Sequence, residues 1–262
     1  MELSVTAYIV PKSGNTMEEC EDAFEFSLEQ NRFAIADGAT ESAFADRWAR
    51  MLVKQFVLDP PFGNPPSEDA LQLWMLPQQE EWHRGVNWST LPWFMEDKAK
   101  RGAFAAFLGL EIGPGSETIW QRLFSRPALH DSMVWQAFAV GDTCLFHIRD
   151  DALTCAFPVT HSEQFGSRPI LLASNPAHNT SALKDIRSAK GDYRPGDLII
   201  LATDALAKWF LTVHEAGGKP WETLEALTNQ ENFEKFVQEL RTSQAMRNDD
   251  TTLAILRWEH HA

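Results

Sequence analysis

The sequence predicts an α+β fold in which β-sheets and helices pack as layers. Strand-like segments occupy both ends of the chain, near residues 3–10 and 251–258, and helix-like segments lie between them. The chain has no internal repeat and no low-complexity linker, so we expect one domain over residues 1–262. A chain of 262 residues is long enough to bury a full hydrophobic core without disulfides.

The first segments have the polarity pattern of strands. Residues 3–10 (LSVTAYIV) are rich in β-branched side chains and end at Pro11, which cannot continue a hydrogen-bonded ladder. Residues 21–28 (EDAFEFSL) alternate between polar and apolar side chains. Residues 32–36 (RFAIA) follow after a short link and end at Asp37-Gly38, which predicts a hairpin.

Residues 41–58 change to helical spacing. One stripe of this segment is apolar: Phe44, Trp48, Met51, Leu52 and Phe56. Thr40 or Ser42 is the expected N-cap, because a hydroxyl there can accept a free backbone N–H of the first turn. Pro60 and Pro61 end the helix.

A Trp- and Pro-rich insertion is expected at about residues 59–100. Within it, residues 67–84 could form a helix, and the remainder has the composition of a loop-rich cover. Four tryptophans fall here: Trp74, Trp82, Trp88 and Trp93. Two interpretations stay open at this stage. Irregularly spaced aromatic residues usually pack as a satellite cluster over the core, whereas exposed tryptophans would indicate a surface for a partner or substrate.

The rest of the chain adds strands and two helices. We expect strands at 103–112, 134–140, 143–149, 152–157, 198–203 and 251–258, and helices at 205–214 and 221–240. The apolar run 198–203 (LIILAT) is typical of a strand buried on both faces. Residues 158–196 are polar and irregular, which predicts a loop-rich segment.

Composition limits the function classes. The chain carries 23 Lys and Arg against 37 Asp and Glu, a net charge of −14, which argues against binding to nucleic acid or to an anionic membrane. Cys20, Cys144 and Cys155 form no CxxC pair and are expected to be reduced. The sequence lacks a signal-peptide pattern and any apolar run of about 20 residues. We therefore expect a soluble, cytoplasmic protein.

Acidic residues recur where predicted strands begin or end. They are Glu21, Asp22, Asp37, Asp142, Asp204, Asp249 and Asp250. Each alone has an ordinary explanation as a turn residue or a helix cap. Gathered at one sheet edge, such carboxylates would repel one another, and a hard divalent cation such as Mg²⁺ or Mn²⁺ would relieve that repulsion. A pair of ions about 4 Å apart could then activate water toward a phosphoryl group.

Five motifs, in order along the chain, carry a resemblance to a known family. They are ED at 21–22, FAIADGAT at 33–40, AVGDT at 139–143, LATDAL at 201–206 and NDDTTLAIL at 248–256. This set resembles the metal-dependent protein phosphatases of the protein phosphatase 2C family, in particular their bacterial branch. The resemblance implies a four-layer α-β-β-α sandwich of two packed antiparallel sheets flanked by helices. It also implies a metal cleft at one edge and a flap-like segment at about 158–196.

The resemblance also implies roles for individual residues. Asp37 would bridge two metal ions, and Glu21 with the Gly38 carbonyl would complete the shell of one of them. Asp204 and Asp249 would bind the second ion. Asp22 would orient metal-bound water, and Asp142 would belong to a third site shared with Asp204. The implied catalytic residues are thus Asp22, Asp37, Asp204 and Asp249, with two or three Mg²⁺ or Mn²⁺ ions.

Three positions depart from the family pattern. Met17 stands where many members carry a phosphate-gripping arginine, and Lys12 is the cation that could replace it. Ala39 replaces the histidine that follows DG in some members, and Ala205 replaces the usual glycine after Asp204. None of the three removes an implied metal ligand.

Two functions follow from these observations. The first is metal-dependent hydrolysis of phosphoserine or phosphothreonine in a phosphoprotein substrate. The second is a phosphatase-like module of weak or no turnover that binds metal and a protein partner, which Met17, Ala39 and the Trp-rich insertion favour. The sequence favours the enzyme, because a decayed site is expected to lose its ligand carboxylates first and all of them are present. The sequence does not identify the particular phosphoprotein substrate or the oligomeric state.

Overall fold

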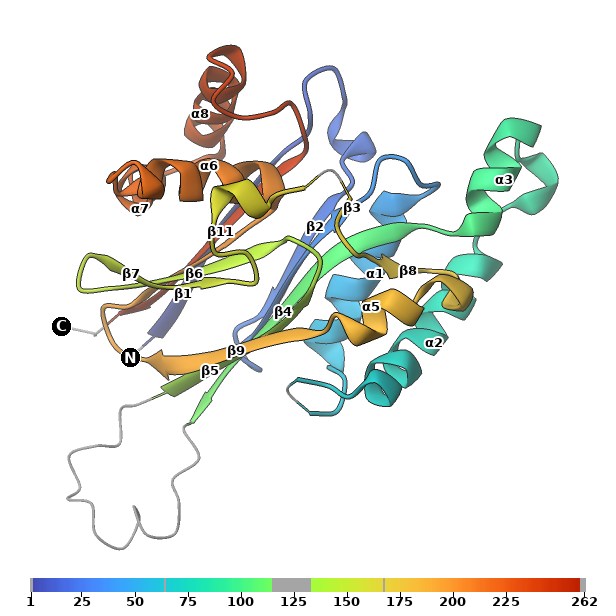
Figure 1. The fold of residues 1–262 in the computed structure, drawn as a ribbon, viewed down its shortest axis with the longest axis horizontal. Coiled ribbons are helices and arrows are strands. Elements are labelled where there is room, and N and C mark those ends of the chain that lie inside the picture. Colours follow the sequence, from blue (N-terminus) through green and yellow to red (C-terminus); the bar gives the residue numbers. More distant parts are fainter. Residues whose placement is uncertain (1, 64, 115–132, 167, 260–262) are drawn as a thin grey trace, which may run out of the picture.

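The computed structural model describes residues 2–63, 65–114, 133–166 and 168–259, and its strands form two antiparallel sheets (Figure 1). The first sheet has the order β1-β11-β10-β6-β7: Glu2–Val10, Thr251–Glu259, Leu198–Ala202, Cys144–Arg149 and Ala152–Phe157. The second has the order β2-β3-β4-β5-β9: Asp22–Ser27, Arg32–Gly38, Phe104–Pro114, Met133–Val140 and Arg187–Tyr193. The short strand β8, Leu172–Ala173, pairs with the start of β4.

Helices cover the outer face of each sheet (Figure 1). On the second sheet lie α1 (Ala45–Leu58), α2 (Glu68–Arg84) and the short α5 (Thr180–Lys184), whereas α3 (Trp93–Arg101) projects beyond the end of this sheet, next to the start of β4 (Figure 1). On the first sheet lie α6 (Asp204–Glu215), α7 (Pro220–Glu225) and α8 (Gln230–Thr242). Short 3-10 turns are η1 (Met17–Glu19), η2 (Trp88–Thr90), η4 (Ser162–Gln164) and η5 (Pro176–His178). The predicted four-layer α-β-β-α sandwich is confirmed.

Among the described residues, three hydrophobic cores lie between the four layers. The sheets pack face to face through fully buried side chains such as Phe33, Leu108 and Ile199. Trp48, Phe56 and Phe107 belong to the core between the second sheet and its helices, and Phe146, Phe210 and Phe233 to the core between the first sheet and its helices. Because every layer has an apolar face against the next, the two sheets are closely packed and position the loops at their edges.

The chain ends contribute to one sheet. β1 pairs with β11 in antiparallel register from Glu2↔Glu259 to Val10↔Thr251. β10 is paired on both sides, with β11 and with β6, and all five of its residues are buried. The prediction of a strand buried on both faces at 198–203 is therefore confirmed.

Three predicted details are wrong. The N-cap of α1 is Phe44 in a left-handed conformation (φ 57°), because the Ser42 hydroxyl donates to the Ala39 carbonyl and accepts from the Phe104 amide instead. The helix predicted at 221–240 is divided into α7 and α8, since the Asn229 side chain accepts the Asn232 N–H and starts a new helix. The segment 158–196, described except for residue 167, contains the edge strand β9, whose polar sequence RSAKGDY hides its pairing with β5.

The insertion at 59–100, described except for residue 64 and the side chain of residue 94, contains the expected helix as α2 and an unexpected one, α3. Trp74 and Trp82 are buried, and their indole N–H groups donate to the carbonyls of Asp59 and Phe44. Trp88 packs on the same core, whereas Trp93 is 81% exposed. The core interpretation therefore holds for three of these tryptophans. Among the described residues, no helix has the length and apolar character needed to cross a bilayer.

Candidate active site

The topology brings the predicted acidic residues to one edge of the sandwich. Asp22 pairs with Asp37 in the β2–β3 ladder. Ala202, near the end of β10, pairs with Cys144 at the start of β6 and with Leu253 near the start of β11. The residues just beyond these strand ends therefore meet: Asp142 before β6, Asp204 after β10 and Asp249 before β11. Five strands from two sheets thus supply carboxylates to one place.

A pocket of about 730 Å³ lies at this edge. Its lining includes Asp37, Gly38, Asp142, Asp204 and Asp249, which are five of the predicted site residues. Such a volume is in the range of small-molecule sites and can hold more than a single phosphate group. Asp22 is buried beneath the pocket, at 3% exposure, and Glu21 and Lys12 are absent from the lining.

The carboxylates are close enough to perturb one another. Burial raises the pKa of Asp37 well above its ordinary value, and the charges of Asp204 and Asp22 raise it further. Burial, followed by the charge of Asp204, raises the pKa of Asp142 to about 7. Burial also raises the pKa of Asp204, although Arg247 opposes this rise. Like charges concentrated in this way are typical of a site that receives a cation.

Asp22 is held by two hydroxyls. Its Oδ2 accepts from Thr203 Oγ1 at 2.9 Å and from Thr252 Oγ1 at 2.7 Å. Its Oδ1 has no hydrogen-bond partner, and the same is true of Asp204 Oδ1. A buried carboxylate oxygen without a partner is costly, so both atoms are open acceptors: Asp204 lines the pocket, and Asp22 is buried next to the pocket-lining Asp37 in the β2–β3 ladder.

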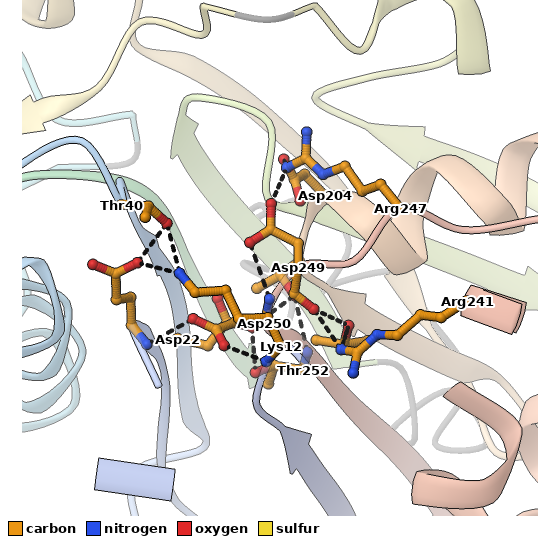
Figure 2. Close-up of polar contacts among 12 residues, drawn as sticks. Lys12, Asp22, Thr40, Asp204, Arg241, Arg247, Asp249, Asp250 and Thr252 are labelled. Atoms are coloured by element: carbon orange, nitrogen blue, oxygen red, sulfur yellow. Dashed lines mark hydrogen bonds and ion pairs between the residues drawn. The ribbon is translucent and has the colours of Figure 1, made fainter. Parts of the chain in front are cut away.

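Asp250 connects the last strand to the beginning of the chain (Figure 2). Its Oδ1 accepts from the Lys12 backbone N–H at 2.7 Å and its Oδ2 from the Glu21 N–H at 2.9 Å. The Lys12 ammonium donates to Glu21 Oε2 at 3.1 Å and to Thr40 Oγ1 at 3.0 Å. Lys12 and Glu21 therefore pair with each other at the rim, beside the pocket-lining carboxylates.

Arg247 is a cation of the site that the sequence interpretation missed. Its guanidinium contacts the carboxylates of both Asp204 and Asp249, and half of its side chain is exposed (Figure 2). The signal available in the sequence was its position two residues before Asp249 in the motif RNDD. Arg241 stabilises the loop that carries Arg247 and Asp249, since it donates to the carbonyls of Pro11 and Asp249.

Gly38 occupies a place where a side chain does not fit. A Cβ there would lie 2.8 Å from the Glu21 carbonyl oxygen and 3.0 Å from Ala45. The Gly38 N–H donates to that same carbonyl at 3.1 Å. The absent side chain thus lets the backbone of β3 approach Glu21 closely at the acidic edge.

The donor set suits a hard divalent cation. Carboxylate oxygens and a backbone carbonyl are the ligands that Mg²⁺ and Mn²⁺ prefer, and two of the carboxylate oxygens are unpartnered. Within the described residues, no three Asp, Glu, His or Cys side chains are arranged as ligands of one ion. Instead, the Arg247 guanidinium lies between Asp204 and Asp249 as a positive charge of the chain itself.

Comparisons with known proteins support the fold. No protein-family model matches the sequence, and no curated protein matches it. Among solved structures, PppA, a regulatory component of the type VI secretion system in Pseudomonas aeruginosa, is similar with a TM-score of 0.59 at 17% identity, over 98% of each chain. The Mycobacterium tuberculosis serine/threonine phosphatase PstP/Ppp is similar with a TM-score of 0.60 at 13% identity, over 99% of this chain and 100% of that one.

A third similar structure contains bound manganese ions. The catalytic domain of the serine/threonine phosphatase PstP, in complex with two manganese ions, is similar with a TM-score of 0.56 at 16% identity, over 98% of this chain and 99% of that one. At such identities the likeness establishes the architecture rather than the activity. Together with the two sheets and three cores, it shows that this chain has the fold of the protein phosphatase 2C family, as its motifs indicate.

Proposed function

We propose that this protein is a metal-dependent phosphatase that hydrolyses phosphoserine or phosphothreonine in a phosphoprotein. The observation that carries the proposal is the meeting of Asp37, Asp142, Asp204 and Asp249 in one pocket, where burial and mutual repulsion favour a divalent cation. Asp37, the Gly38 carbonyl and Glu21 would hold one Mg²⁺ or Mn²⁺ ion. Asp204 and Asp249 would hold a second ion, and Asp142 with Asp204 a third. Such ions, when bound, lower the pKa of water and neutralise phosphate charge.

The chain's own groups around these ligands have separate tasks. Asp22, fixed by Thr203 and Thr252 through Oδ2, keeps Oδ1 without a partner, and this oxygen would orient water bound at the ions. Asp250 fixes the Glu21 backbone. These positioning contacts are buried, so they persist without reorganisation during a reaction.

We assign the substrate phosphate to Arg247, because it lines the pocket directly beside the carboxylates Asp204 and Asp249. Met17 leaves the usual arginine position empty of charge, and Lys12 is occupied by Glu21 and Thr40. Arg247 lines the pocket and contacts two carboxylates there. A planar guanidinium can exchange a carboxylate for a phosphate, because both accept its paired N–H donors.

The test is hydrolysis of p-nitrophenyl phosphate and of a phosphoserine peptide with Mn²⁺ or Mg²⁺. We expect turnover that EDTA abolishes and that Asp37→Asn lowers by more than about 100-fold. Asp192→Asn, at an exposed carboxylate of β9, is the matched control and should retain activity. Turnover that survives EDTA or Asp37→Asn would contradict the mechanism.

The alternative is a phosphatase-like module that binds metal and a protein partner with little turnover. It is favoured by the contact of Arg247 with Asp204 and Asp249, which already neutralises part of the acidic charge. Calorimetry that detects Mn²⁺ binding, without turnover on any phosphopeptide, would support this alternative over the enzyme.

A further inference from the structure

A basic wall lines the same pocket as the acidic residues. We define it as Lys98 and Arg101 of α3, Arg168 of the following flap-like segment and His178 of η5. All four side chains are exposed. The chain has a net charge of −14, so the presence of the cations Lys98, Arg101 and Arg168 in the lining of one pocket contrasts with its overall acidic composition.

Ordinary helix electrostatics explains only part of this wall. The last turn of α3 carries three cations, Lys98, Lys100 and Arg101, and basic residues there complement the helix dipole. Lys100 pairs with Glu96 at 2.8 Å. Lys98 and Arg101 are three residues apart, share a helix face and line the pocket. Neither has an ion pair or hydrogen bond with any residue that the structure describes.

The end of α3 is fixed against the core. Gly102 follows with φ 90°, and a Cβ there would lie 2.8 Å from Ser174 Oγ. The Asn175 side chain donates to the Lys100 carbonyl at 3.0 Å, and Ser174 Oγ accepts from the Ala103 N–H at 2.8 Å. Ala99 is buried beneath. Lys98 and Arg101 therefore project from an ordered platform.

The basic wall lies within peptide reach of the acidic residues. Asp37 pairs with Ala106 in the β3–β4 register, and Arg101 precedes Ala106 by five residues. Five residues of chain span at most about 17 Å. An extended substrate whose phosphorylated residue lies at Asp37 would therefore reach the basic wall with a side chain within about five positions.

We propose that Lys98 and Arg101 bind a second anionic group of the substrate, carried close in sequence to the phosphorylated residue. The assignment rests on the proposed function and specifies its substrate class as acidic phosphopeptides. The anion can be a carboxylate or a second phosphate, since both accept hydrogen bonds from Lys and Arg. Because the cations are exposed, they set substrate preference and association more than the rate of chemistry.

The experiment compares phosphoserine peptides that carry Glu, Gln or a non-hydrolysable phosphonate residue at the flanking positions. We expect kcat/KM to be about three- to tenfold higher for the Glu than for the Gln peptide, through KM, and the ratio to shrink as salt is added. The phosphonate peptide tells whether phosphate is preferred to carboxylate. Lys98→Gln with Arg101→Gln should bring the Glu/Gln ratio close to one, whereas Lys54→Gln, at an exposed lysine of α1, should leave it unchanged.

Two outcomes separate this assignment from the proposed function. Equal kcat/KM on Glu and Gln peptides, in an enzyme that hydrolyses both, would overturn the basic wall's role and leave the phosphatase intact. If no substrate is hydrolysed, the phosphatase proposal fails, and fluorescence anisotropy of labelled Glu and Gln peptides tests the wall directly. Equal affinities in that assay would then overturn it.

Discussion

The two sides of the pocket are built differently. The acidic side draws on the ends of strands in both sheets. Burial raises the pKa of Asp22, Asp37, Asp142 and Asp204, and the buried hydroxyls of Thr203 and Thr252 hold Asp22. The basic side comes from a short helix and loops of the insertion and the flap-like segment, and its cations are exposed. The proposed chemistry, which requires exact placement, would thus depend on strand ends, whereas the exposed cations lie at the periphery, where substitution is not expected to unfold the protein.

The largest difference between the two sides should appear in activity. We expect Asp249→Ala to lower kcat/KM by more than about 100-fold on p-nitrophenyl phosphate and on every phosphopeptide, because it removes an implied ligand. Arg168→Gln should change only the preference among peptides, by a few-fold, because its side chain is exposed. Steady-state kinetics on both substrate types measures this. Equal losses from the two variants on all substrates would break the comparison.

A matched pair of glycines tests how tightly each side is packed. A Cβ at Gly38 would lie 2.8 Å from the Glu21 carbonyl, whereas one at Gly166, on the side of Arg168, meets nothing within 4 Å. We therefore expect Gly38→Ala to lower the free energy of unfolding by about 1–3 kcal/mol and Gly166→Ala to change it by less than about 0.5 kcal/mol. Urea denaturation followed by circular dichroism gives both values. Similar effects at the two positions would show that the acidic side is not the tighter one.

Arg247 is the exception to this comparison, because it is a cation that lies among the acidic residues. Removal of its charge by Arg247→Gln leaves Asp204 and Asp249 to repel each other, so the metal-free protein should lose about 1 kcal/mol of stability. Mn²⁺ should bind several-fold more tightly by calorimetry, because it no longer competes with a guanidinium. Weaker Mn²⁺ binding in this variant would mean that Arg247 assists the metal instead of opposing it.

The last prediction concerns the pH dependence of the stability of the metal-free protein. The folded pKa of Asp142 is raised from 3.8 to about 7, so between these values the folded state holds a proton that the unfolded state releases. The free energy of unfolding in EDTA should therefore decrease as the pH rises through this window, and Asp22, Asp37 and Asp204 act with the same sign. Asp142→Asn should reduce the slope by at most about 1.4 kcal/mol per pH unit. An unchanged slope in thermal melts would exclude Asp142 as a contributor.

The sequence predicts most of this fold because its strands are strongly patterned. The apolar run of β10 and the β-branched run of β1 are fixed by burial, which local composition reports well. β9 was not predicted because an edge strand with a polar face has little apolar signal. α3 was not predicted because its charged sequence WFMEDKAKR has few side chains that become buried. The division between α7 and α8 depends on a single side-chain cap at Asn229.

The candidate site was predictable in its acidic part only. Each carboxylate lies at a strand end, and the motif order carries the resemblance, so Asp37, Asp142, Asp204 and Asp249 could be named in advance. Their convergence depends on strand order, which no local pattern reveals. The pairing of Lys12 with Glu21 and of Arg247 with Asp204 depends on contacts between side chains of different loops. The spacing of residues in the sequence does not predict such contacts.

Asp250 accepts the backbone N–H groups of Lys12 and Glu21, and β1 pairs with β11 over its full length. These contacts constrain the order in which the protein can fold during synthesis. The only described neighbour of β1 is β11, so during synthesis β1 cannot pair until residues 251–259 have left the ribosome. A nascent or C-terminally cleaved chain would hold the early acidic residues without the late ones. Assembly of the pocket therefore requires residues 249–259, and a product that ends before them cannot form it.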